Sequence, residues 1–115
     1  MENNIEIDEI IAYCLAKPGA YKDYPFGDIP ICIRYNKKIF AQIYPNPWDC
    51  KITLKCNPDS AEFYRRIFPE VVTRGYHCPP VQQPYWNTVK LDLIPKDELW
   101  NMIDHAYEQV LLRRR

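Results

Sequence analysis

Three consecutive segments of alternating apolar and polar residues constrain the fold of this chain most strongly. They run from Ile31 to Tyr35, from Ile39 to Tyr44 and from Lys51 to Cys56. Alternation with a period of two is typical of strands that bury one face, and the Asn36-Lys37-Lys38 spacer between the first two segments suits a hairpin. The sequence therefore predicts three successive antiparallel strands.

Amphipathic helices are predicted before and after these strands. An apolar stripe with helical spacing precedes them, with Asp8 as the expected N-cap and Pro18-Gly19 as the stop. Asn57-Pro58 is a strong helix start, because the asparagine can cap a helix that has proline at its first position. The last helix is expected after Pro95, with an apolar stripe formed by Leu99, Ile103, Ala106, Tyr107, Val110 and Leu111.

A fourth alternating segment, from Trp86 to Leu93, completes the pattern, with Val89, Leu91 and Leu93 expected on one side. Residues 19–30 are expected to form a loop, and residues 70–85 the least regular part of the chain. The predicted order is α-β-β-β-α-(irregular)-β-α. Half-buried strands and separate helices predict an α+β fold, with an antiparallel sheet covered by helices on one face.

Length and composition indicate one domain over residues 1–115. Hydrophobic residues make up 47% of the chain, which argues against a disordered protein. The five cysteines are an odd number without a Cys-x-x-Cys pair, which does not suit a secreted disulfide framework. The start has no signal-peptide pattern, and no apolar run is long enough to span a bilayer. We therefore expect a cytoplasmic protein with reduced thiols and no membrane association.

The charges cancel overall but not locally. Fifteen basic and fifteen acidic side chains give a net charge of zero, which removes the simplest argument for a nucleic-acid partner. Residues 29–74, however, hold eight bases and four acids, whereas residues 1–28 hold six acids and two bases. The chain is thus expected to have a moderately basic centre.

Strand parity places several of these bases on one face of the sheet. If Ile33, Ile52 and Val89 point to the helices, the neighbours that point outward include Arg34, Lys51, Thr53, Lys55, Thr88 and Lys90, with Trp86 beside them. Cations mixed with aromatic rings suit nucleic acid, because cations meet phosphates and rings offer stacking surfaces. The simpler interpretation is that these side chains only solvate the sheet. The register of the second strand leaves open whether Phe40 joins them or enters the core.

Five short motifs follow one another along the chain. They are Tyr24-Pro25-Phe26-Gly27, Ile52-Thr53-Leu54-Lys55-Cys56, Gly75-Tyr76-His77, Trp86-Asn87-Thr88-Val89 and Ile103-Asp104-His105-Ala106-Tyr107-Glu108. In this order they resemble the MmcQ/YjbR family of small bacterial proteins. The resemblance implies a frataxin-like (CyaY-like) fold in which the first and last helices lie side by side. It also implies weak, nonspecific binding of double-stranded DNA, for which the expected contacts are Arg34, Lys51, Lys55, Lys90 and Trp86.

One departure from the family pattern opens alternatives. Between His77 and Trp86 the family usually carries a short basic stretch, whereas residues 78–85 hold four uncharged polar or aromatic residues, three prolines and no lysine or arginine. A protein-interaction module is the second hypothesis, using the face around Trp86 and this proline-rich loop. A small-ligand pocket beneath residues 24–27 is the third. The residues expected at such a pocket or partner contact are Phe26, Tyr76, His77 and Thr88.

Neither a metal site nor catalysis is expected. His77-Cys78 is the only adjacent pair of metal donors, and structural zinc sites need two such short-spaced pairs. The chain has no Gly-x-Ser-x-Gly and no phosphate-cradling glycine loop. We therefore expect no cofactor and no enzyme activity. His105, on the flank of the last helix, is expected to make a capping or packing hydrogen bond.

Overall fold

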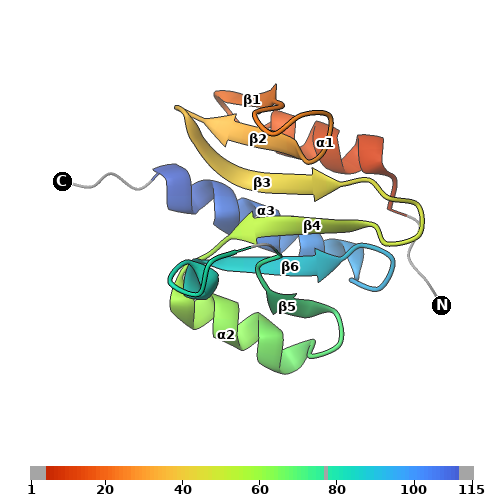
Figure 1. Ribbon diagram of the computed structural model, residues 1–115, viewed down its shortest axis with the longest axis vertical. Coiled ribbons are helices and arrows are strands. Elements are labelled where there is room, and N and C mark those ends of the chain that lie inside the picture. The colour runs from red at the N-terminus through yellow and green to blue at the C-terminus, as the bar shows by residue number, and fades with distance from the viewer. Residues whose placement is uncertain (1–4, 77, 112–115) are drawn as a thin grey trace.

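The computed structural model describes residues 5–76 and 78–111, which form three α-helices, one short 3-10 helix and a six-stranded sheet (Figure 1). In chain order the elements are α1 (Ile7–Leu15), β1 (Ala20–Asp23), β2 (Ile31–Tyr35), β3 (Lys38–Tyr44), β4 (Lys51–Lys55), α2 (Pro58–Ile67), β5 (Val72–Arg74), η1 (Gln83–Tyr85), β6 (Trp86–Lys90) and α3 (Lys96–Leu111). The α+β class and the four predicted strands are confirmed. Among the described helices, none combines the length and apolarity needed to cross a bilayer.

The sheet has the order β1-β2-β3-β4-β6-β5, and all neighbouring strands are antiparallel. The two edge strands correct the sequence prediction, which placed β1 in a loop over 19–30 and β5 in an irregular segment over 70–85. β1 has four residues and β5 three. Segments this short show no readable alternation, and they become strands because β2 and β6 offer them a hydrogen-bonding edge.

α1 and α3 cover the same face of the sheet, behind it in the view of Figure 1. Their side-by-side packing is confirmed by Tyr13 and Trp100, whose rings stack at 4.1 Å with an angle of 7°. The Tyr13 hydroxyl donates to Asp104 Oδ1 at 2.7 Å, and Lys17 pairs with the same carboxylate. Four side chains, those of Tyr13, Lys17, Trp100 and Asp104, thus join α1 and the residues just after it to α3.

α2 packs against β5, β6 and η1, and its start is as predicted. The Asn57 side chain accepts a hydrogen bond from the Ser60 backbone N–H at 2.8 Å and thereby caps the helix. The expected Asp8 cap of α1 is wrong, because the helix begins at Ile7 with Glu6 as N-cap, and Asp8 lies inside its first turn. Leu93 was also misplaced: β6 ends at Lys90, and Leu93 is exposed in the turn that follows.

The open question of Phe40 is answered by a β-bulge. β2 and β3 change register between Ile33 and Arg34, so that Ile33 pairs with Ala41 but Arg34 pairs with Ile39. The extra residue, Phe40, turns toward the helices and is fully buried. Its ring meets the edge of Tyr107 from α3 at 5.5 Å. The bulge thus adds an aromatic side chain to the core and leaves Ala41 and Ile43 facing inward as well.

Candidate binding face

We call the face of the sheet opposite α1 and α3 the outer face. The centre of this face is covered and hardly accessible to solvent. Thr53 and Thr88 point outward as parity predicted, but they are only 2% and 6% exposed. Their hydroxyl oxygens are 2.8 Å apart, and Thr88 Oγ1 also accepts the backbone N–H of Tyr76 at 2.7 Å. The chain after β5 therefore crosses the outer face at this point and covers both threonines.

Tyr76 brings an aromatic cluster onto this face. Its ring meets that of Tyr44 edge-on, with centroids 5.3 Å apart and an angle of 83°. Lys51 Nζ lies 3.9 Å from the Tyr76 ring centroid and 2.7 Å from Asp49 Oδ2. A cation between a ring face and a carboxylate is held in place. Lys51 therefore organises the face rather than extending freely from it.

The other predicted cations differ in how far they are engaged. Arg34 Nε donates to Asp23 Oδ2 at 2.6 Å, and its Nη1 donates to the Lys37 carbonyl at 2.8 Å. Lys55 Nζ lies 5.0 Å from the Trp86 ring, and partial burial lowers its pKa. Lys90 is exposed, directly across the strands from Lys51. The structure thus places all of the predicted cations on or beside one face, but Arg34 and Lys51 already hold a carboxylate.

A hollow lies beside this cluster, and we call it the outer hollow. Its volume is about 500 Å³, and its walls are formed by Phe26, Ile29, Pro30, Gln42, Tyr44 and Tyr76. Phe26 and Ile29 are 64% and 54% exposed, and both lie at this one hollow rather than apart on the surface. The Tyr44 hydroxyl donates to Gln42 Oε1 at 3.2 Å. This hydrogen bond orients the two polar side chains in the wall of the hollow.

Two of the four residues predicted for a pocket line the outer hollow, together with residues that the sequence did not reveal. Phe26 and Tyr76 line it together, while Thr88 lies buried beneath Tyr76 and His77 lies outside the described residues. Gln42 and Tyr44 were missed. Both could have been found from parity, because they alternate with the inward Ala41 and Ile43. Ile29 had no such signal.

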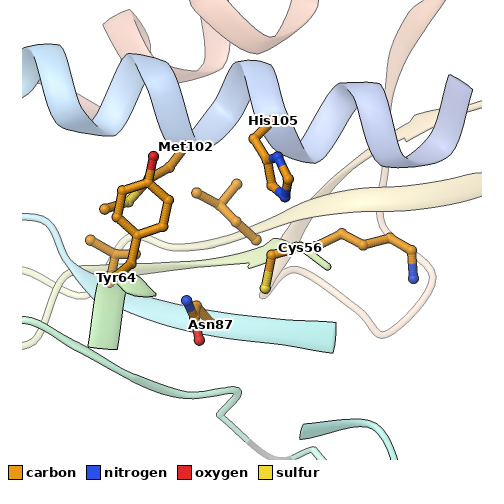
Figure 2. Close-up of a pocket in the computed structure, with 8 residues that line it drawn as sticks. Cys56, Tyr64, Asn87, Met102 and His105 are labelled. Carbon is orange, nitrogen blue, oxygen red and sulfur yellow. The ribbon is translucent and has the colours of Figure 1, made fainter. Parts of the chain in front are cut away.

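A much smaller cavity lies on the helix side of the sheet. Figure 2 shows Tyr64, Met102 and His105 directed toward the space between α3 and the sheet, with Asn87 and Cys56 below. Its volume of about 10 Å³ is close to that of a single water site. This cavity is a packing feature of the core and is too small for a ligand.

His105 and Cys56 line this cavity, and burial favours the uncharged form of both side chains. His105 Nε2 accepts the backbone N–H of Asn57 at 3.2 Å, which confirms the expected packing hydrogen bond. Burial lowers the pKa of His105 and so favours the neutral ring that this bond requires. Burial also raises the pKa of Cys56 to about 12, which keeps its thiol protonated. Over residues 5–76 and 78–111, no group of three or more histidine, cysteine or acidic side chains could hold a metal ion.

Comparison with known proteins agrees with this architecture. The chain is 26% identical to the uncharacterized protein YjbR of Escherichia coli K12 over 106 residues, which is 91% of this chain and 86% of that protein. Protein DR2400 of Deinococcus radiodurans, which contains a DUF419 domain, has a crystal structure with a TM-score of 0.83 at 22% identity, covering 93% of this chain and 79% of that one. A Pseudomonas syringae protein, structural genomics target PsR293, gives 0.73 at 20% identity, covering 90% and 97%.

At these identities the two crystal structures establish the fold alone. A model of the YjbR family, however, matches residues 15–109, which include the strands, α2, the residues of the outer hollow and most of α3. The motifs first noted in the sequence lie within the same range. The chain belongs to the YjbR family.

Proposed function

We propose that this protein is a non-catalytic interaction module that binds a protein partner through the outer hollow. The observation that carries the proposal is the exposure of Phe26 and Ile29 on the rim of a concave, aromatic-walled site. Apolar side chains of this size stay exposed at a cost in water unless a partner covers them. Aromatic residues gathered around a pocket are also the commonest anchors of protein interfaces.

The electrostatics of the outer face support a protein partner as well. Lys51 is neutralised by Asp49 and Arg34 by Asp23, so half of the four predicted cations carry their own counter-charge. An interface of this kind supplies orientation through its rim and affinity through its apolar centre. The lack of catalysis is part of the proposal and is supported by the buried thiols of Cys14 and Cys56, whose pKa values are both raised to about 12.

Photo-cross-linking in the native cells tests the proposal. Benzoylphenylalanine is placed at position 26, on the rim of the hollow, and, as a matched control, at position 63. Phe63 is a phenylalanine of α2 with 52% exposure that does not line the hollow. We expect a discrete cross-linked product from position 26 that is absent from position 63. Identical patterns from the two positions would contradict a partner at the outer hollow.

DNA binding is the second candidate, and it is favoured by Lys55 beside Trp86 at one end of the β4–β6 ladder and exposed Lys90 at the other end. Lys55 lies over the Trp86 ring, which leaves a cation and an aromatic surface side by side. These residues could anchor a phosphate backbone without reading bases. The test is fluorescence anisotropy with a labelled random-sequence duplex at 50 and 200 mM salt. On this hypothesis Lys55→Glu with Lys90→Glu abolishes a salt-sensitive signal, and a wild-type protein that does not bind at 50 mM salt rules it out.

A further inference from the structure

A second hollow lies on the helix side of the sheet, between α2, β5 and the proline-rich loop over 78–85. Its walls include Glu62 and Arg65 of α2, Arg74 of β5, and Pro80, Gln83 and Pro84 of the loop and η1. Its volume is about 640 Å³. We call it the arginine pocket. It shares no lining residue with the outer hollow.

Arg65 is the fixed element of this pocket. Its Nε donates to Asn87 Oδ1 at 2.7 Å, and its Nη2 donates to the carbonyls of Gln83 at 2.6 Å and Trp86 at 3.0 Å. All three acceptors are neutral. Across the part of the chain that the structure describes, no carboxylate lies within 4.0 Å of this guanidinium. Arg65 therefore presents a positive charge that is rigidly held but not neutralised.

Arg74 adds a second positive charge to the same pocket. It pairs with Asn87 between β5 and β6, so its side chain leaves the sheet on the side of α2. Partial burial is the largest cause that lowers the pKa of Arg65, and the nearby charge of Arg74 lowers this pKa further. Glu62 is the acid on the wall, and it pairs with Arg66 at 3.1 Å, with both side chains 71% exposed. A flexible surface pair of this kind leaves the two pocket arginines short of negative charge.

We propose that the arginine pocket binds a carboxylate of an acidic peptide segment. Arg65 donates its Nε–H and both Nη2 hydrogens to the protein, which leaves the two hydrogens of Nη1 for a carboxylate oxygen. The guanidinium of Arg74 is the one that can bind the carboxylate through two parallel hydrogen bonds. The rings of Pro80 and Pro84 give the pocket apolar surface against which a peptide can lie. A concave site of this size admits a side chain or a chain end, whereas the backbone of a duplex is convex and would contact only the rim.

Nuclear magnetic resonance titration of the full chain tests the proposal. The probes are a blocked tetraglutamate peptide, the matched tetraglutamine peptide, inorganic phosphate and a short DNA duplex. The Nε–H resonance of Arg65 is the reporter, because that group points into a fixed hydrogen bond next to the pocket. We expect a saturable shift with tetraglutamate and none with tetraglutamine. No shift with tetraglutamate, or tighter binding of phosphate or duplex, would overturn the proposal.

Three variants separate the pocket from a general charge effect. Arg74→Gln should weaken tetraglutamate binding by about tenfold or more, as expected for losing a hydrogen bond to a charged group. Lys22→Gln removes the same charge at β1, on the opposite edge of the sheet, and should leave binding unchanged. Glu62→Gln should tighten binding, because it removes the acid from the wall. Equal losses in Arg74→Gln and Lys22→Gln would show nonspecific attraction instead. Because the outer hollow is untouched, failure here leaves the proposed partner site standing.

Discussion

Replacing His105 with glutamine should remove a defined part of the pH dependence of stability. His105 Nε2 accepts the Asn57 N–H at the N-terminus of α2, so only the neutral ring can make this bond. A protonated ring carries a hydrogen on Nε2, which would then face the Asn57 N–H as donor to donor. The hydrogen bond would be lost, at a cost of about 1 kcal/mol. Glutamine can still offer an acceptor oxygen there, and it stays neutral at every pH.

The sign follows from the direction of the pKa shift. Burial lowers the pKa of His105 in the folded protein below its ordinary value of 6.5. As the pH falls below 6.5, the unfolded chain binds a proton at this residue more readily than the folded protein does. The free energy of unfolding therefore decreases with falling pH, by at most about 1.4 kcal/mol per pH unit for one proton, and levels off below the folded pKa.

The assay is urea denaturation of wild type and His105→Gln from pH 7.5 to pH 5.0, followed by tryptophan fluorescence. Carboxylate titration contributes equally to both proteins, so the difference between the two curves isolates His105. We expect wild type to lose stability relative to the variant as the pH drops through 6.5. His77→Gln removes the only other histidine and serves as the control. Parallel curves for wild type and His105→Gln over this range would refute the reasoning.

The remaining predictions concern the contacts that hold the helices and the outer face. Asp104→Ala removes the shared acceptor between α1 and α3 and should lower the free energy of unfolding by about 1–3 kcal/mol in urea titrations, while exposed Glu108→Ala on the same helix changes it by less than about 0.5. Thr88→Val should cost about 1–3 kcal/mol by the same measurement, because it strands the buried hydroxyl of Thr53 and the N–H of Tyr76. Adding Thr53→Val to Thr88→Val should restore part of that loss; a double variant less stable than Thr88→Val would contradict the pairing.

The elements that the sequence predicted are those whose signal is local. The capped start of α2 at Asn57, the alternation of the four longer strands and the stripe of α3 each follow from residues within one segment. β1 and β5 depend instead on hydrogen bonding to the edges of β2 and β6. A segment of three or four residues is too short for its alternation to predict a strand. Phe40 illustrates the same limit, since a bulge is a property of two paired strands.

The candidate site was harder to predict because it is assembled from distant segments. Parity correctly placed Thr53, Thr88 and Lys51 on the outer face, but it could not show that the chain at Tyr76 crosses over them. The carboxylate that neutralises Arg34 belongs to Asp23, in a segment read as loop. A count of charges along the strands therefore overstated the free positive charge on the face.

The central claim is that the outer hollow binds a protein partner, and the affinity of the purified, cross-linked partner for two matched variants tests it most directly. Phe26→Glu places a charge on the rim of the hollow, whereas Phe63→Glu makes the same change on α2, and both side chains are exposed enough for folding to tolerate the substitution. We predict that Phe26→Glu weakens binding by at least about tenfold, typical of losing an interface anchor, and that Phe63→Glu binds like wild type. Wild-type affinity in Phe26→Glu would contradict the account.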